Sequence, residues 1–205
     1  MAARPRARIR TNDPAGMRAR VLDAAAASFQ AQGYHGSSMQ DIVSAAGVTG
    51  GALHHHFPTK RDLAHAVIAE RVSEELAKTW IATLEAAPTA AEGIIRVFED
   101  VADGLDARGS VSGCPLGNLS LEVSLADEIL RGAVEREYRT WRSAVAACLQ
   151  RDADAGHAPF VGDDAAGLAD TVVAIFTGAM SVAKAEQSAV TLRACSRALR
   201  RIMGT

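Results

Sequence analysis

The chain has few cysteines, the residues on which many secreted and zinc-stabilised proteins depend. Its 205 residues include three cysteines, Cys114, Cys148 and Cys195, an odd number at wide spacing and without a CxxC pair. This usage argues against a disulfide framework and against a structural zinc site. We therefore expect a cytoplasmic protein that carries no metal and no other cofactor.

Membrane segments and familiar catalytic motifs are also missing. No P-loop, GxSxG, HExxH or dinucleotide-binding fingerprint occurs, so an enzyme is a weak alternative. The arginine-containing N-terminus has no apolar segment behind it, unlike a signal peptide. The longest nearly apolar run, 165–183, contains Asp170 and hydroxyl side chains and is barely long enough to cross a bilayer. We interpret this run as a buried helix and expect no membrane association.

Apolar residues recur at helical spacing between capping residues and glycine or proline stops. Aromatic residues make up only 4% of the chain, whereas alanine is abundant, and neither an internal repeat nor a strand pattern occurs. The sequence therefore predicts an all-α fold. The expected helices are at about 13–33, 38–46, 49–57, 59–85, 88–108, 118–125, 130–155, 164–186 and 188–203, with loops at 109–117 and 156–162.

Charge is distributed unevenly along the chain. Residues 1–63 hold eight Lys or Arg against four acids, a balance of +4, so the remainder, with 14 basic and 20 acidic residues, has a balance of −6. The N-terminal part is therefore the favoured place for a polyanion.

Three consecutive histidines in "ALHHHFPTK" raise the question of a metal site. Consecutive residues of a helix point about 100° apart, and no histidine here has a second histidine at i+4. With Leu53 and Phe57 on the buried side, His55 lies almost opposite, His54 flanks it and His56 sits at the edge of the core. The histidines therefore form a surface rather than a set of metal ligands.

A helix, a tight turn at Gly47 and a second helix form a helix-turn-helix pattern. The stretch from "VLDAAAASFQAQGY" to "SSMQDIVSAAGVTGGALHHHFPTKRDLAHAVI" resembles the TetR family of bacterial transcriptional regulators, because turn, core residues and the following F-P-x-K fall in register. The segment "GCPLGNLSLE" is similar to the subgroup of the LmrA and YxaF type.

The resemblance implies an N-terminal three-helix helix-turn-helix DNA-binding domain and a larger C-terminal helical ligand-binding and dimerisation domain. We divide the chain into a basic arm (1–12), the DNA-binding domain (13–63) and the larger domain (64–205). The resemblance further implies a homodimer that binds double-stranded operator DNA, most often as a repressor. It releases the operator when a small-molecule effector enters the larger domain.

The residues that the resemblance places on DNA lie at the start of the second helix and along the third. Gly50 stands where the family often has lysine, and His54 where it often has tyrosine. Imidazoles and hydroxyls can donate to phosphates or base edges. If the histidines contact phosphate, operator affinity should rise as pH falls through about 6.5. The alternative, that histidines merely occupy helix positions, applies more to His56 than to His55. The set is Ser38, Gln40, Thr49, Gly50, Ala52, His54, His55, His56 and Lys60.

Four arginines in "RPRARIR" form a basic arm that is either a solubilising tail or a phosphate-following or minor-groove arm. If the arm replaces the donors missing at Gly50 and His54, deletion of residues 1–10 should weaken DNA binding and flatten its dependence on salt, because fewer counterions are released. DNA affinity measured at several salt concentrations, for the full chain and for the deletion, gives both the loss of binding and the change in slope. An unchanged slope would count against the arm as a DNA contact.

Large side chains of the larger domain are candidates to line an effector pocket, although core packing explains each of them as well. Few charged residues lie on the apolar helix faces that carry these side chains, which favours an apolar or amphipathic effector. Asn118, Glu122 and Tyr138 are the candidates for polar specificity. The set is Trp80, Phe98, Leu105, Leu116, Asn118, Glu122, Tyr138, Trp141, Phe176 and Met180.

The last two predicted helices are the dimer interface implied by the resemblance, and the core of a single subunit is the alternative. Cys114 in "SGCPLG" is a candidate redox-sensing thiol, but no histidine or lysine neighbours it in sequence, which favours a buried small hydrophobe. A metal-responsive regulator that uses His54, His55, His56 or His65 fails on spacing unless two subunits share the ion.

Overall fold

The computed structural model describes residues 13–157 and 164–204, so the basic arm and the predictions made for it lie outside the described residues. Within these ranges every regular element is a helix. The prediction of an all-α fold is therefore confirmed, and the expected helices are all present.

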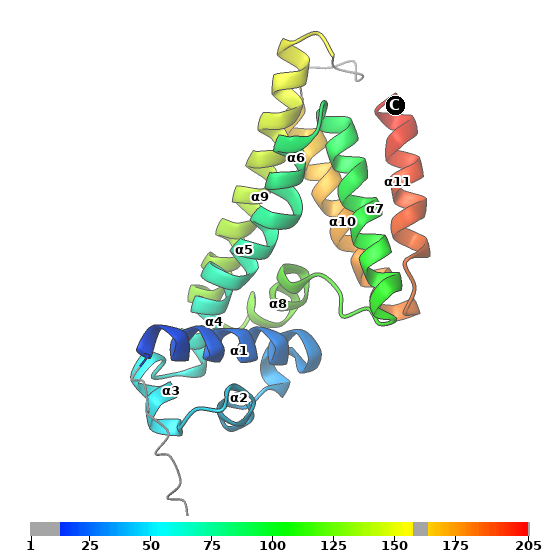
Figure 1. Cartoon of the computed structure of the whole chain (residues 1–205). Coiled ribbons are helices and arrows are strands. Elements are labelled where there is room, and N and C mark those ends of the chain that lie inside the picture. Colours follow the sequence, from blue (N-terminus) through cyan, green and yellow to red (C-terminus); the bar gives the residue numbers. More distant parts are fainter. Residues whose placement is uncertain (1–12, 158–163, 205) are drawn as a thin grey trace, which may run out of the picture.

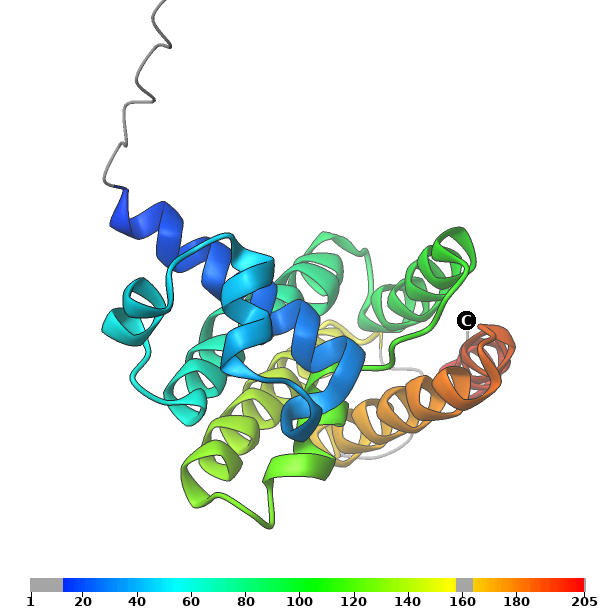
Figure 2. The ribbon, with the colours of Figure 1, turned by 90° about the horizontal axis from the view of Figure 1, so that it is seen from below.

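Three helices form one end of the molecule. α1 (Pro14–Gly36) lies across α2 (Met39–Ala46) and α3 (Gly50–His56). Figure 1 shows α2 and α3 on the side of α1 that faces away from the longer helices, and Figure 2 looks directly at this end. The unit is held together by side chains from the three predicted apolar stripes, each no more than 3% exposed: Val21, Leu22, Phe29, Ile42, Leu53 and Phe57.

A continuous helical segment leads from this end into the rest of the molecule, in agreement with the helix expected at 59–85. It comprises α4 (Lys60–Ala66), the π-helical turns η1 (Val67–Val72) and η2 (Ala77–Ile81), and the α-helical segments α5 (Ser73–Leu76) and α6 (Ala82–Ala86). A capping box between Thr59 and Asp62 fixes its start.

Five further helices form the larger part. They are α7 (Ala90–Arg108), α8 (Pro115–Val123), α9 (Glu128–Asp154), α10 (Ala165–Glu186) and α11 (Val190–Ile202). α10 packs against α9 and α11, and α11 also packs against α7, whereas the short α8 lies between α1 and α9 (Figure 1). α8 is thus the element of the larger part that contacts the N-terminal unit.

Two boundaries differ from the sequence prediction. Gly33, with φ 79° and ψ 164°, interrupts α1 where the sequence predicts its end, and one further helical turn continues to Gly36. The loop predicted at 109–117 ends at Cys114, because Pro115 occupies the first turn of α8, where its fixed φ is already helical.

The core of the larger part contains a cluster of aromatic rings. Phe176 meets Trp80, Phe98 and Trp141 edge to face, with ring centroids 5.0, 5.2 and 5.6 Å away. Edge-to-face packing places the positive edge of one ring against the negative face of another and stabilises such clusters beyond burial alone. The cluster fixes the relative position of η2, α7, α9 and α10.

α10 is the one helix in the described ranges that is long and apolar enough to cross a membrane by length and composition, with a mean hydropathy of 1.6 over its most apolar window. Of that window 39% is buried, on the face that packs against α9 and α11. The described part of the chain therefore buries α10 on one side only, which is less than the buried helix expected from the sequence.

Candidate DNA-contacting surface and internal cavity

Local caps build the helix-turn-helix. The Ser38 hydroxyl accepts a hydrogen bond from the Asp41 N–H at 3.0 Å, which starts α2, and the Thr49 hydroxyl accepts one from the Ala52 N–H at 3.2 Å, which starts α3. Between them Gly47 ends α2 in the left-handed region at φ 63°. Leu53 and Phe57 then bury one side of α3, so its other side is presented outward.

Most of the predicted DNA-facing residues lie on this outward surface. Gln40, Thr49, His54 and His55 are exposed, while Gly50, Ala52 and His56 are half-buried. The His54 ring nitrogen Nδ1 lies 3.4 Å from the Pro58 carbonyl oxygen, and the His55 and His56 rings meet edge to face at 5.4 Å. A Cβ added at Gly50 would meet nothing within 4 Å. The surface therefore has room for a partner.

Two members of the set are engaged elsewhere. The Lys60 ammonium lies 4.6 Å above the Tyr34 ring and 3.4 Å from the His35 carbonyl oxygen, at the end of α1. Burial in this position lowers the pKa of Lys60 from its ordinary value. The Ser38 hydroxyl also donates to the Asp41 carboxylate. In this conformation both polar groups stabilise the N-terminal unit itself.

Ion pairs that the sequence did not reveal brace α1 against η1. Both guanidinium nitrogens of Arg18 donate to the Glu70 carboxylate, at 2.6 and 2.5 Å, and the Arg18 guanidinium lies 5.3 Å from the Phe57 ring centre. The hydrogen bonds from Arg18 lower the pKa of Glu70. Arg71 donates to the Asp23 carboxylate at 2.6 Å. The N-terminal unit is thus attached to the long helical segment through side chains 48 and 52 residues apart in sequence.

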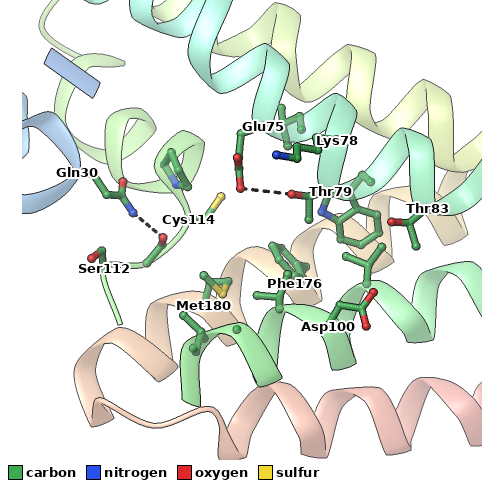
Figure 3. Close-up of a pocket in the computed structure, with 18 of the residues that line it drawn as sticks. Gln30, Glu75, Lys78, Thr79, Thr83, Asp100, Ser112, Cys114, Phe176 and Met180 are labelled. Carbon is green, nitrogen blue, oxygen red and sulfur yellow. Dashed lines mark hydrogen bonds between the residues drawn. The ribbon is translucent and has the colours of Figure 1, made fainter. Parts of the chain in front are cut away.

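A cavity of about 510 Å³ lies between the long helical segment, α7, the loop before α8 and α10. This volume falls in the ordinary range for small-molecule sites. Four predicted residues line it, namely Trp80, Leu105, Phe176 and Met180. Figure 3 shows the sulfur of Met180 and the ring of Phe176 on its α10 side. The other lining residues are Gln30, Glu75, Leu76, Lys78, Thr79, Thr83, Val97, Asp100, Val101, Gly104, Arg108, Ser112, Gly113, Cys114 and Pro115.

Six residues predicted for the pocket do not line this cavity. Phe98, Leu116 and Trp141 are at most 1% exposed and belong to the core, and Tyr138 stacks on Trp141 with ring centres 6.2 Å apart. An apolar stripe shows that a side chain faces inward, but it does not show whether protein or a cavity lies beyond it.

Asn118 and Glu122, the other two, lie at the contact between α8 and α1. The Asn118 side-chain amide donates to the Gln30 side-chain oxygen at 3.2 Å, and the Glu122 carboxylate accepts from the His35 N–H at 3.0 Å. Both residues therefore connect the larger part to the N-terminal unit instead of facing the cavity.

Cys114 lies in the cavity wall with 6% of its surface exposed. Burial raises the pKa of its thiol, which disfavours the reactive thiolate. In the described ranges no group of three or more His, Cys, Asp or Glu side chains is arranged to hold a metal ion. These observations favour a packing role for Cys114 and give no support to the metal-responsive alternative.

The outer faces of α10 and α11 carry apolar side chains that the described residues leave uncovered. Val182 is 41% exposed on α10, and Val190 and Ile202 are 66% and 59% exposed on α11. Leu168, Ile175 and Cys195 are half-buried beside them. The two helices therefore present an apolar face in addition to the one that they bury within the chain.

Comparison with known proteins covers both parts of the chain. Residues 21–67 match the family described as "Bacterial regulatory proteins, tetR family", and residues 90–198 match "Transcriptional regulator LmrA/YxaF-like, C-terminal domain".

Two curated relatives and one solved structure illustrate the similarity. The HTH-type transcriptional regulator LmrA of Bacillus subtilis is 30% identical over 126 residues, which cover 62% of this chain and 67% of LmrA. The HTH-type transcriptional repressor DhaR of a Mycobacterium species is 30% identical over 166 residues, 78% of each chain. The fold is shared with a cysteine mutant of the regulator CifR complexed with 26 bp double-strand operator DNA, with a TM-score of 0.76, 21% identity and coverage of 98% of this chain and 100% of that one.

Proposed function

Because the chain belongs to the TetR family of bacterial transcriptional regulators, with an LmrA/YxaF-like C-terminal domain, we propose that it is a repressor controlled by a small apolar or amphipathic effector. The observation that carries this proposal is the outward-facing α3 at one end of a chain whose other part contains a half-open cavity of about 510 Å³. The family consists of regulators, and we assign the chain no catalytic role and a cytoplasmic location.

For the DNA-binding domain we propose residues 13–63, preceded by the arm, and for the ligand-binding and dimerisation domain residues 64–205. α3 enters the major groove, and the exposed Thr49, His54 and His55 contact phosphates or base edges. CifR, which shares this fold, is complexed with operator DNA, and this supports operator DNA as the partner of the chain. Ser38 and Lys60 contribute once they exchange their internal partners for phosphate oxygens.

The partner of the apolar face on α10 and α11 is, we propose, the same face of a second copy. A twofold interface buries one patch against itself, so Val182, Val190 and Ile202 would leave water in both subunits. Two copies of α3 then read two half-sites one or more helical turns apart, and the operator is an inverted repeat.

Selection from a random double-stranded DNA pool tests the function directly. The purified protein should enrich an inverted repeat whose half-sites match the spacing of the two α3 helices. Recovery of sequences without a common motif would contradict sequence-specific regulation.

Filling the cavity should separate effector response from DNA binding. Gly104 lies in the cavity wall on α7, and a Cβ there would meet only the Arg108 guanidinium, at 3.5 Å or more. Gly104→Leu therefore adds a side chain at the cavity wall, and its Cβ makes ordinary contacts with the Arg108 side chain. Compounds that stabilise the wild-type protein in a thermal-shift screen should bind the variant about ten- to a hundredfold more weakly, while operator affinity changes less than about twofold.

Gly132→Leu is the matched control, because Gly132 is also a helical glycine beside an arginine four residues on, at 3.8 Å, but lies on α9 away from the cavity. Equal loss of compound binding in both variants would show that the cavity is not the effector site.

A further inference from the structure

A second cavity of about 640 Å³ lies directly under the N-terminal unit, between α1, the η1 to η2 region and α8. Its walls include Ala26 and Phe29 of α1, Val72 of η1 and Leu119 of α8. Part of this cavity is therefore made by the proposed DNA-binding domain.

The two cavities meet. Gln30, Glu75, Lys78 and Pro115 line both of them, so these four residues form the boundary between the two spaces. Figure 3 shows Glu75 and Lys78 projecting from the long helical segment on one side of the junction and Gln30 facing it from the other. The junction thus brings together a residue of α1 and two residues of the segment that leads to the aromatic cluster.

Gln30 has a free hydrogen-bonding position at this junction. Its side-chain nitrogen donates to the Gly113 carbonyl oxygen at 2.6 Å, and its oxygen accepts from Asn118 at 3.2 Å. A primary amide has two N–H bonds, so among the described residues the second remains available for an acceptor. Gln30 can therefore bind a guest while it still contacts the loop before α8.

The chemistry changes along the joined cleft. The first cavity has the apolar side chains Trp80, Phe176 and Met180 together with the charged Asp100 and Arg108. The part beneath α1 has Ala26 and Phe29 together with the charged Asp23, Arg71 and Glu74. Between them the junction presents one acid, one base and one amide. Opposite charges three residues apart favour a neutral dipolar group over an ion, because either charge sign would meet a repulsive neighbour.

We propose that the two cavities form one effector cleft for an elongated neutral molecule, with an apolar aromatic end beside Trp80 and a hydrogen-bond acceptor that reaches Gln30 of α1. This inference rests on the proposed function and adds the class of effector and a contact made by the DNA-binding domain itself. An effector bound in the cleft contacts α1 directly, in addition to any movement of the long helical segment that it causes.

The test uses prodan, 6-propionyl-2-(dimethylamino)naphthalene, an elongated neutral aromatic ketone. The only two tryptophans of the chain, Trp80 and Trp141, both belong to the aromatic cluster, so energy transfer from tryptophan to prodan reports binding in the cleft. Three variants are compared with the wild type: Gln30→Leu, Gln30→Glu, which keeps the size but removes the amide donor, and Gln32→Leu as the control at an exposed position of α1 outside both cavities.

Prodan should bind the wild-type protein and Gln32→Leu equally, and both Gln30 variants about three- to tenfold more weakly, the loss expected for one neutral hydrogen bond. Prodan should also weaken operator binding by the wild type more than by Gln30→Glu. Absence of energy transfer in the wild type, or equal affinity in all four proteins, would overturn the inference.

Operator binding without prodan is measured separately. If the protein does not bind operator DNA while prodan binding still depends on Gln30, the proposed function is wrong and the cleft inference is supported. If operator binding is normal while Gln30 is irrelevant to prodan, the cleft inference alone is wrong.

Discussion

Replacement of His54 and His55 by glutamate should lower operator affinity at least about a hundredfold. Each histidine is exposed on α3, and the described residues provide no partner for its ring other than the 3.4 Å approach of His54 to Pro58 and the edge-to-face contact of His55 with His56. Two imidazole donors would be lost and two negative charges placed against phosphates, in each subunit of a dimer. A loss of about 1–3 kcal/mol for each contact gives the expected factor.

A mobility-shift titration on the selected inverted repeat measures this effect. Ala82→Glu is the control, because Ala82 is exposed on α6, away from the helix-turn-helix, and adds the same type of charge. Circular dichroism should show the double variant folded. Retention of operator affinity in a folded His54→Glu/His55→Glu protein would exclude α3 as the DNA-reading element.

Phe176→Ala should destabilise the protein by about 3–5 kcal/mol. Phe176 is 5% exposed and holds three other rings within 5.0 to 5.6 Å, so its removal leaves a void among side chains from η2, α7 and α9. The void cannot close easily, because each of those rings is fixed on a different helix. The effector cavity would also lose its apolar end.

Urea denaturation followed by tryptophan fluorescence measures the change, since both tryptophans are neighbours of Phe176. Phe176→Leu keeps most of the apolar volume and should lower the free energy of unfolding by clearly less than Phe176→Ala does. Equal stability of Phe176→Ala and the wild type would mean that the aromatic cluster does not hold the larger part together.

Elements specified by local signals could be predicted from the sequence. Ser38, Thr49 and Thr59 cap the helices that they were expected to cap, and Gly47 makes the expected turn. These signals act over three or four residues, so a single sequence contains them completely. The same holds for the exposure of His54 and His55, which follows from the burial of Leu53 and Phe57.

The cavity could be predicted only in part. Trp80 and Trp141 have the same pattern in the sequence, yet only Trp80 lines the cavity. The difference arises from which helix packs beyond each ring, and periodicity carries no information on that.

The junction between the two parts could not be predicted. Gln30 contacts Gly113, 83 residues away, and Arg18 contacts Glu70, 52 residues away. Lys60 and Glu122 were assigned to DNA and effector on the basis of charge and position. Both lie at the end of α1 because folding brings α4 and α8 to it.

The central claim is that this chain reads a specific DNA sequence through α3. Fluorescence anisotropy of a labelled fragment from its own upstream intergenic DNA, with a scrambled fragment of equal length and a range of salt concentrations, tests it most directly. The account predicts tight, salt-sensitive binding to the intergenic fragment that exceeds binding to the scrambled one and is weakened by His55→Ala. Equal affinity for the two fragments, unaffected by His55→Ala, would contradict it.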